Sequence, residues 1–330
     1  MTVTTTTALG RPTSALGRSV NALGRAGTWW IVVALVVIGL VGVSQFGSAT
    51  NLQNLLRQGS ALGIVAIGQT LVILTGGMDL SVGALMGLVA VLANGTMAGR
   101  PENIPAAVAI AIVAGLAVGL FNGTMIVKTR INPIILTFGM LSVLQGLIFV
   151  YTDKTVGSSP PEFQALAYGS IAGIPTPALL CAVILVGAWA LLRYTGFGRY
   201  LYAVGGNADH ARRAGIPTGR VLLLTYVLSS LLAAIAGLVL AARLGTGYTL
   251  AGLGFEIDAV VVVVLGGTAL TGGRGGVIGT LAGLLVLSMV NNLLNLLAVS
   301  AYVQQVIKGV IVVAAVAVSG IAEHNRRNQR

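Results

Sequence analysis

Long apolar runs recur along this chain from Trp29 to Gly320, and each is close to the roughly 20 residues that a helix needs to cross hydrocarbon. Only 8% of the 330 residues are charged, whereas 56% are hydrophobic. A water-soluble domain carries about 25% charged residues, so this chain has too few charges to cover a surface that faces water. The sequence therefore predicts an all-α, polytopic integral membrane protein.

Ten apolar runs separated by polar breaks are candidate transmembrane helices. They cover residues 28–46, 59–76, 80–98, 104–127, 133–152, 177–195, 221–243, 256–271, 277–299 and 303–320. The 256–271 run is short, and we expect a broken or half-spanning helix whose ends are covered by protein or by a water-filled cavity. The segments 1–27 and 321–330 are predicted to be cytoplasmic tails on either side of a transmembrane domain at 28–320.

The amino-terminal segment repeats the sequence Ala-Leu-Gly-Arg three times, with a period of seven residues. The copies are Ala8–Arg11, Ala15–Arg18 and Ala22–Arg25. The glycine and threonine content favours a loosely ordered tail over an amphipathic helix lying on the membrane surface. The apolar run that follows, from Trp29 to Val43, reaches the upper length limit of a signal peptide, so we interpret it as a retained first span.

The distribution of lysine and arginine predicts the orientation of the chain. With the amino terminus inside, fourteen of the 19 basic residues fall in inner breaks, four fall in outer breaks, and Lys308 lies within the last span. Cytoplasmic loops carry an excess of basic residues, so both termini are predicted to be cytoplasmic. This bias accounts for the net charge of +11. Nucleic-acid binding would require a basic helix face or an aromatic-basic patch, and the sequence contains neither.

An internal repeat relates two glycine breaks. Residues 75–88 align without gaps on residues 271–284, and each copy continues into an apolar run with Gly-x-x-x-Gly spacing. Small residues at this spacing let helix backbones approach closely within a membrane. Duplicated segments with broken helices are typical of transporters, in which irregular backbone lines a substrate path. The alternative is a chance alignment in a chain with 46 glycines, and the relative orientation of the copies stays open.

The longest inner break, residues 196–220, is polar and rich in glycine. Residues 208–214 have a composition compatible with a helix, Asn207 is suited to cap its start, and Gly215 and Pro217 are suited to end it. This pattern predicts a short cytoplasmic helix, held crosswise, that can press into a partner protein. An ordinary solvated loop is the alternative.

Several polar side chains fall within or near the predicted spans. They are Gln69, Asn122, Gln145, Asn291, Asn292, Asn295 and Lys308. Amides offer both a donor and an acceptor to a sugar hydroxyl, although for any single amide the pattern favours hydrogen bonding between helices. Asp79 or Ser81 is suited to cap the third span, and a role of Asp79 in gating is the alternative. Lys308 has no obvious carboxylate partner in the sequence.

The residues that would support catalysis are missing from the pattern. There is no nucleophile–base pair, no cluster of metal ligands, and a single cysteine, Cys181, which excludes an intramolecular disulfide. The glycine-rich stretch 267–274 is not a phosphate loop, because Gly273 and Arg274 stand where that motif requires Lys and then Ser or Thr. We therefore expect a non-enzymatic chain without a cofactor of its own.

Four motifs, in the same order and at similar separations, resemble those of the ribose/xylose/galactose-type ABC permeases, a family of membrane subunits of bacterial monosaccharide importers. They are Gly76–Gly83; Ala203–Asn207 with Ala211–Ile216; Gly266–Thr280 with Asn291 and Asn292; and Gln305–Gly309. The resemblance covers about Gln53–Gly320. The departures are the repeated amino-terminal tail and Met78, where the family often has a branched aliphatic residue.

The resemblance implies a multi-pass permease of the bacterial inner membrane that forms a pore with a second copy or a close relative. It implies separate ATPase subunits that hold ATP and Mg²⁺ inside, and an extracytoplasmic sugar-binding protein outside. The implied ATPase-coupling residues are Gly205, Gly206, Asn207, Arg212, Arg213, Gly215, Ile216 and Pro217. The pore or signature candidates are Gln69, Asp79, Ser81, Asn122, Asn291, Asn292, Asn295 and Lys308.

Two other classes of protein remain as alternatives. An ion-coupled secondary transporter of a small polar solute would need an acid buried within a span, and the acids available are Asp79, Glu256 and Asp258, all at predicted span ends. A membrane-embedded enzyme would need clustered catalytic residues at an interface. Neither class explains the long inner segment. Pentoses, hexoses and polyols are equally compatible with the sequence as cargo.

Overall fold

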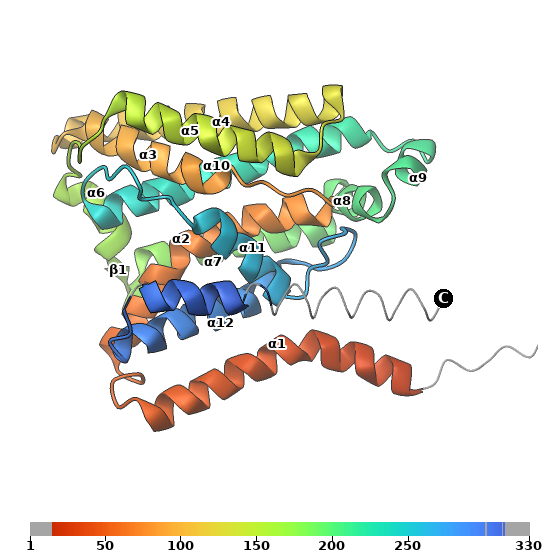
Figure 1. The fold of residues 1–330 in the computed structure, drawn as a ribbon, viewed down its shortest axis with the longest axis horizontal. Helices are drawn as coiled ribbons and strands as arrows, with labels where there is room; N and C mark the ends of the chain where they lie inside the picture. Colours follow the sequence, from red (N-terminus) through yellow and green to blue (C-terminus); the bar gives the residue numbers. More distant parts are fainter. Residues whose placement is uncertain (1–14, 301, 312, 314–330) are drawn as a thin grey trace, which may run out of the picture.

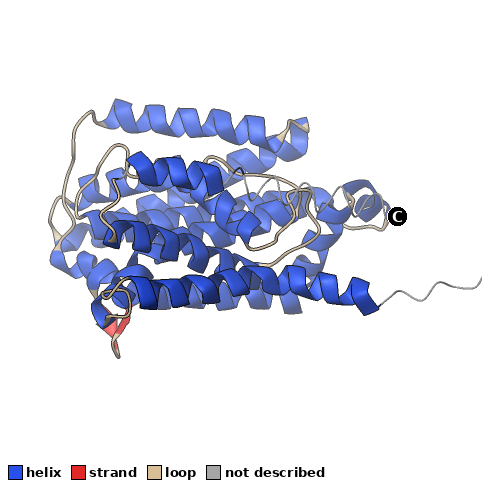
Figure 2. Ribbon diagram, turned by 60° about the horizontal axis from the view of Figure 1, so that its bottom comes forward, coloured by secondary structure: helices blue, strands red, loops and turns tan. Residues whose placement is uncertain are grey.

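The computed structural model describes residues 15–300, 302–311 and 313, which form an elongated bundle of helices (Figure 1). The helices are α1 (Ala15–Gly42), α2 (Ala49–Leu74), α3 (Val82–Met97), α4 (Ile104–Thr129), α5 (Pro133–Tyr151), α6 (Pro161–Tyr168), α7 (Thr176–Tyr194), α8 (Gly196–Gly206), α9 (Ala208–Arg213), α10 (Thr218–Leu244), α11 (Phe255–Leu265) and α12 (Val277–Leu296), with a 3-10 turn η1 at Pro101–Asn103. Within the described residues, β1 (Ser170–Ile171) and β2 (Ile174–Pro175) form one short antiparallel hairpin at an end of the bundle (Figure 2). The predicted all-α class is confirmed.

Six of the described helices, α2, α4, α5, α7, α10 and α12, are long and apolar enough to cross a membrane. The apolar part of α1 at Gly27–Gly42 and the whole of α3 are shorter. α11 has 11 residues, in agreement with the short run predicted at 256–271. The predicted polytopic membrane protein is thus confirmed. The number of ten spans is not, and much of the run at 303–320 lies outside the described residues, as does the tail 321–330.

Two helices begin earlier than the apolar runs predicted. α1 begins at Ala15, so the second and third Ala-Leu-Gly-Arg copies are helical where a loosely ordered tail was expected, and the first copy lies outside the described residues. α2 begins at Ala49 instead of residue 59. The reason is a local cap, because the Ser48 hydroxyl oxygen accepts a hydrogen bond from the Asn51 N–H at 3.2 Å. The sequence predicted a later start because the first turns of α2 contain polar residues, which are typical of a break between helices.

The centre of the bundle is formed by α2, which packs against α7, α10, α11 and α12. In the apolar part of α2, 83% of the residues are buried inside the protein, whereas the figure for α5 and for α7 is 17%. On α5, Ile135, Phe138 and Val150 are exposed. Such side chains are stable when lipid surrounds them, because lipid tails are as apolar as leucine. The break that follows α2 therefore lies in the protein interior.

Small residues set the contact between α4 and α10. Gly115, Gly119 and Gly123 recur every four residues along one face of α4. A Cβ added at Gly119 would lie 2.7 Å from the Cα of Val227, and one at Gly123 would lie 3.0 Å from the Cα of Leu223. Because these glycines have no side chain, the two backbones approach directly, as is common where lipid supplies no hydrophobic force between helices.

We expect that Gly119→Val lowers the thermal stability of the protein. The two methyl groups would meet the α10 backbone, and overpacking of this kind costs about 1–3 kcal/mol. The measurement is the melting temperature in lipid nanodiscs. Gly139→Val on α5 is the matched control, because nothing lies within 4 Å of a Cβ added there. Equal melting temperatures for the two variants would contradict this account of the α4–α10 contact.

Candidate functional site

The inner segment between α7 and α10 contains the predicted helix. α9 covers Ala208–Arg213, and the Asn207 side-chain oxygen caps it by accepting a hydrogen bond from the His210 N–H at 2.9 Å. Gly215 follows with a φ of +81°, a left-handed conformation that glycine adopts without strain and that ends the helix. The predicted cap and the predicted end of this helix are confirmed.

A second helix in this segment, α8, was not predicted. Thr195 caps it through its hydroxyl oxygen, which accepts from the Gly198 N–H at 3.1 Å. The glycines of α8 suggested a loop, yet Leu201 and Val204 are buried at a helical spacing of three. They pack in one cluster with Leu71 and Leu74 of α2. The helical spacing of Leu201 and Val204 is the sequence pattern that could have predicted α8, and the burial of these two side chains holds α8 against the core.

The residues of α9 divide into an anchor and an exposed surface. Ala211 is buried, while Asn207, Arg212, Arg213 and Gly215 are exposed. Arg212 lies 3.8 Å from the Asp209 carboxylate, but both side chains are more than half exposed, so this pair adds little stability. α8 and α9 lie at the same end of the bundle as the start of α1 (Figure 1). The segment therefore presents a small basic surface on a helix that is fixed to the core.

The break between α2 and α3 places Asp79 in the protein interior. Its side chain is completely buried. One carboxylate oxygen accepts hydrogen bonds from the N–H and the hydroxyl of Ser81, at 3.0 and 2.6 Å. The other oxygen accepts from the Ser229 hydroxyl of α10 at 3.4 Å. Across the described part of the chain, Asp79 is in no ion pair. Hydroxyl and amide donors, rather than a cation, therefore hold this carboxylate in place.

Three of the other predicted residues belong to the same network. With its amide turned so that nitrogen faces the Asp79 carbonyl, Gln69 donates to that carbonyl at 3.1 Å and accepts from the Asp79 N–H at 3.3 Å. Asn122 of α4 donates to the Ser81 hydroxyl at 3.0 Å. The structure thus brings together Gln69, Asp79, Ser81 and Asn122, which come from three separate parts of the sequence.

Buried polar atoms without a hydrogen-bond partner lie on the helices around this break. They are the Asn122 side-chain oxygen on α4, and the Tyr226 and Ser230 hydroxyls on α10. Tyr226 and Ser230 were not among the predicted residues. A Cβ at Gly77 would lie 2.5 Å from the Tyr226 hydroxyl, which places that hydroxyl against the break itself. Unpaired buried polar atoms are uncommon, and each calls for a partner such as water or a ligand.

The remaining predicted residues do not join this network. Asn292 of α12 and Asn51 of α2 exchange two hydrogen bonds between their amides, at 2.7 and 3.0 Å. Asn295 accepts from Gln304 at 3.0 Å. The side-chain oxygen of Asn291 is buried without a partner. For Asn292 the contact is the helix-to-helix bond that was the alternative to a role in sugar recognition.

Lys308, which has no obvious carboxylate partner in the sequence, has one in the structure. Its ammonium lies 2.9 Å from the Asp258 carboxylate on α11, and both side chains are mostly buried. The residues are 50 positions apart in the sequence, so no local pattern links them. Only the packing of the chain beyond residue 301 against α11 brings the two charges together.

The two copies of the internal repeat occupy comparable positions. Gly76 and Gly272, which align in the sequence, both have left-handed φ values, of +81° and +84°. Gly83 and Gly87 of α3 lie against the backbone at Gly252, just before α11. Gly279 and Gly283 of α12 lie against the backbone at Gly266, just after α11. Each Gly-x-x-x-Gly pair thus packs against one end of the same short helix.

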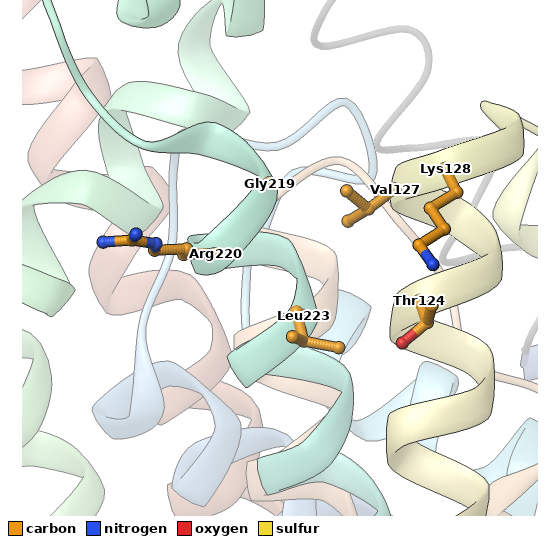
Figure 3. A pocket seen from close by; sticks show the side chains of 6 residues that line it. All are labelled: Thr124, Val127, Lys128, Gly219, Arg220 and Leu223. Atoms are coloured by element: carbon orange, nitrogen blue, oxygen red, sulfur yellow. The ribbon is translucent and has the colours of Figure 1, made fainter.

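A groove of about 460 Å³ opens between the end of α4 and the start of α10 (Figure 3). Its lining residues are Thr124, Val127, Lys128, Gly219, Arg220 and Leu223. The Lys128 side chain extends toward Thr124, whereas the Arg220 side chain points away from α4. None of the predicted pore residues lines this groove, so it is separate from the network at Asp79.

Comparison with known proteins identifies relatives over nearly the whole chain. The family described as branched-chain amino acid transport system / permease component matches residues 51–316. The ribose import permease protein RbsC of Escherichia coli (strain K12) is 40% identical over 295 residues, which are 87% of this chain and 92% of that relative. No solved structure matches the chain.

Two further relatives show how wide the similarity is. The RbsC protein of Bacillus subtilis (strain 168) is 40% identical over 293 residues, with 87% of this chain and 89% of the relative covered. The L-arabinose transport system permease protein AraH of Escherichia coli (strain K12) is 34% identical over 287 residues, or 87% of each chain. The resemblance predicted from four motifs is confirmed, and this multi-pass membrane chain belongs to the family of branched-chain amino acid transport system / permease components.

Proposed function

We propose that this chain is the pore-forming permease subunit of an ATP-binding-cassette importer for a monosaccharide or a related polyol. The observation that carries the proposal is the exposed, basic helix α9, which is fixed through α8 to the helix breaks in the core. Relatives named for ribose, D-allose and L-arabinose support a sugar as cargo. Ion coupling would need a buried acid, and the described residues contain two. Asp79 is held by Ser81 and Ser229, and Glu256 accepts from the Gly254 N–H with one carboxylate oxygen while the other is buried without a partner.

The proposed assembly follows from these features. A second copy or a close relative completes the pore, ATPase subunits bind ATP and Mg²⁺ and dock on α9, and a sugar-binding protein delivers the cargo on the other side. We place the chain in the bacterial inner membrane with α9 facing the cytoplasm. The start of α1 and the α8–α9 segment lie at one end of the bundle and carry predicted inner arginines, which supports this orientation.

The break at Asp79 is the part of the pore that we assign to the cargo path. The unpaired Asn122 oxygen and the Tyr226 and Ser230 hydroxyls lie on α4 and α10, the two helices that hydrogen-bond to this buried break through Asn122 and Ser229. Water or a sugar can satisfy all three, because each hydroxyl of a sugar both donates and accepts. Irregular backbone at membrane depth is tolerated where it lines a cavity or is covered by protein. The cargo is expected to bind weakly here, with the binding protein setting specificity.

The test is ATP-dependent uptake of labelled ribose, arabinose and a hexose panel into proteoliposomes that contain this chain, its ATPase and its binding protein. We expect uptake of at least one sugar to require ATP and both partner proteins. Omitting ATP, the ATPase or the binding protein in turn gives the matched controls. Uptake by this chain alone, driven by an imposed proton or sodium gradient, would contradict the proposal and favour a secondary transporter.

A further inference from the structure

Three chain segments are in direct backbone contact where α8 ends. They are the end of α2 at Leu74, the end of α8 at Gly205, and the second glycine break at Gly272 and Gly273. Figure 1 shows the ends of α2 and α8 and the loop before α12 at the same end of the bundle. We call this contact the glycine junction.

Hydrogen bonding and close packing define the glycine junction. The Gly273 N–H donates to the Leu74 carbonyl at 2.9 Å, which joins the second break to the end of α2. A Cβ added at Gly205 would lie 2.6 Å from the Gly273 nitrogen and would overlap the Leu74 carbonyl oxygen. A Cβ on Gly272 would lie 2.7 Å from the nitrogen of Gly76. The first break, the second break and α8 are thus in contact without a side chain between them.

The neighbouring glycine has a different environment. Nothing lies within 4 Å of a Cβ added at Gly206, which is exposed. Gly205 therefore faces the core while Gly206 faces outward, although the two residues are adjacent and both end α8. Both belong to the segment that was predicted to couple to the ATPase. The geometry favours a role for Gly205 in contacts with the protein core. Contacts with a partner protein are left to the exposed residues from Gly206 onward.

A hydrogen bond also connects α8 to the second glycine break. The Tyr202 hydroxyl donates to the Gly275 carbonyl at 3.0 Å. α8 is also held by Leu201 and Val204, which are buried in one cluster with Leu74. A displacement of α9 would therefore move α8 as a unit. Such a movement would act on the second break at two points, Gly273 and Gly275.

We propose that Gly205 is a positioning residue for energy coupling, and that the glycine junction carries movement of the α8–α9 segment into both helix breaks at once. Side chains between two backbones can absorb a small displacement by changing rotamer, whereas backbone atoms in direct contact cannot. Close-packed contacts of this kind transmit sub-ångström shifts to the elements that they touch. From the junction, one break leads to Asp79 and α3, and the other leads to α12.

This inference rests on the proposed function, because it requires an ATPase that moves α9. The test compares Gly205→Ala with Gly187→Ala of α7, where nothing lies within 4 Å of an added Cβ, in the complete complex in proteoliposomes. Sugar uptake and ATP hydrolysis are measured in the same vesicles, and co-purification of the ATPase is measured in parallel. For Gly205→Ala we expect the ratio of sugar taken up to ATP hydrolysed to fall about tenfold, with the ATPase still bound. For Gly187→Ala we expect the wild-type ratio.

Tyr202→Phe keeps the test decisive if Gly205→Ala does not assemble. This variant removes only the hydroxyl that donates to Gly275, and we expect the same ratio to fall about twofold to threefold with an unchanged melting temperature. A wild-type ratio in Gly205→Ala, or in Tyr202→Phe where Gly205→Ala fails to assemble, would overturn the inference. Absence of ATP-dependent uptake by the wild-type complex would instead refute the proposed function, so the two failures are distinguishable.

Discussion

Replacing Arg212 and Arg213 together by glutamate is expected to abolish ATP-driven uptake while the membrane subunit stays folded. Both side chains are exposed on α9, and neither belongs to the buried clusters of the core. The reversal should therefore leave the melting temperature nearly unchanged. At an interface with the ATPase it would place two negative charges where two positive charges dock, and unfavourable charge pairs of this kind cost several kcal/mol.

The measurements are uptake, ATPase co-purification and melting temperature for the double variant. Arg100→Glu/Lys154→Glu is the matched control, because it makes the same change in net charge at two exposed cations that are predicted to lie on the outer side. We expect the control to retain uptake. Equal loss in both double variants would show that net charge, and not docking of α9, is responsible.

Asp79→Ala is expected to destabilise the protein strongly and to remove transport with it. The carboxylate accepts hydrogen bonds from the N–H and hydroxyl of Ser81 and from the Ser229 hydroxyl. Alanine would leave these donors buried without an acceptor, at a cost of about 1–3 kcal/mol for each one that finds no other partner. Asp79→Asn keeps an oxygen that can accept from Ser81, so its loss of stability should be smaller.

The melting temperatures of the three proteins in lipid nanodiscs give the comparison, with uptake measured on the same preparations. We expect the order wild type, then Asp79→Asn, then Asp79→Ala. Equal stability of the alanine variant and the wild type would refute the structural role of this carboxylate. A stable asparagine variant without uptake would show that the negative charge itself is needed during transport.

Much of the local structure could be predicted because the relevant signals are close together in the sequence. The scarcity of charge and the recurring apolar runs predicted a polytopic helical membrane protein. Asn207, Gly215 and the residues between them predicted α9 and its ends, since capping and helix termination depend on a few neighbouring residues. The short run at 256–271 predicted a short helix, and α11 is one.

Errors occurred where a distant contact overrides the local pattern. At the polar start of α2 the Ser48 cap begins the helix, and the Asn51 side chain can be buried there because it bonds to Asn292, 241 residues further along the chain. The glycines of α8 suggested a loop, but two apolar residues hold it against α2. Lys308 lacked a partner in the sequence because its partner, Asp258, lies on a different helix.

The amino-acid sequence was sufficient to predict a helical membrane permease, the short helix α11, and the start and end of α9, and it suggested that the two glycine breaks are related. The packing of the helices was needed to show that Gln69, Asp79, Ser81 and Asn122 form one network, and that Gly205 meets the end of α2 and the second break. Composition and capping act within a few residues, whereas Asn122 and Ser81 are 41 positions apart in the sequence and Gly205 and Leu74 are 131 positions apart. Such contacts follow from how the helices pack, which no local pattern encodes.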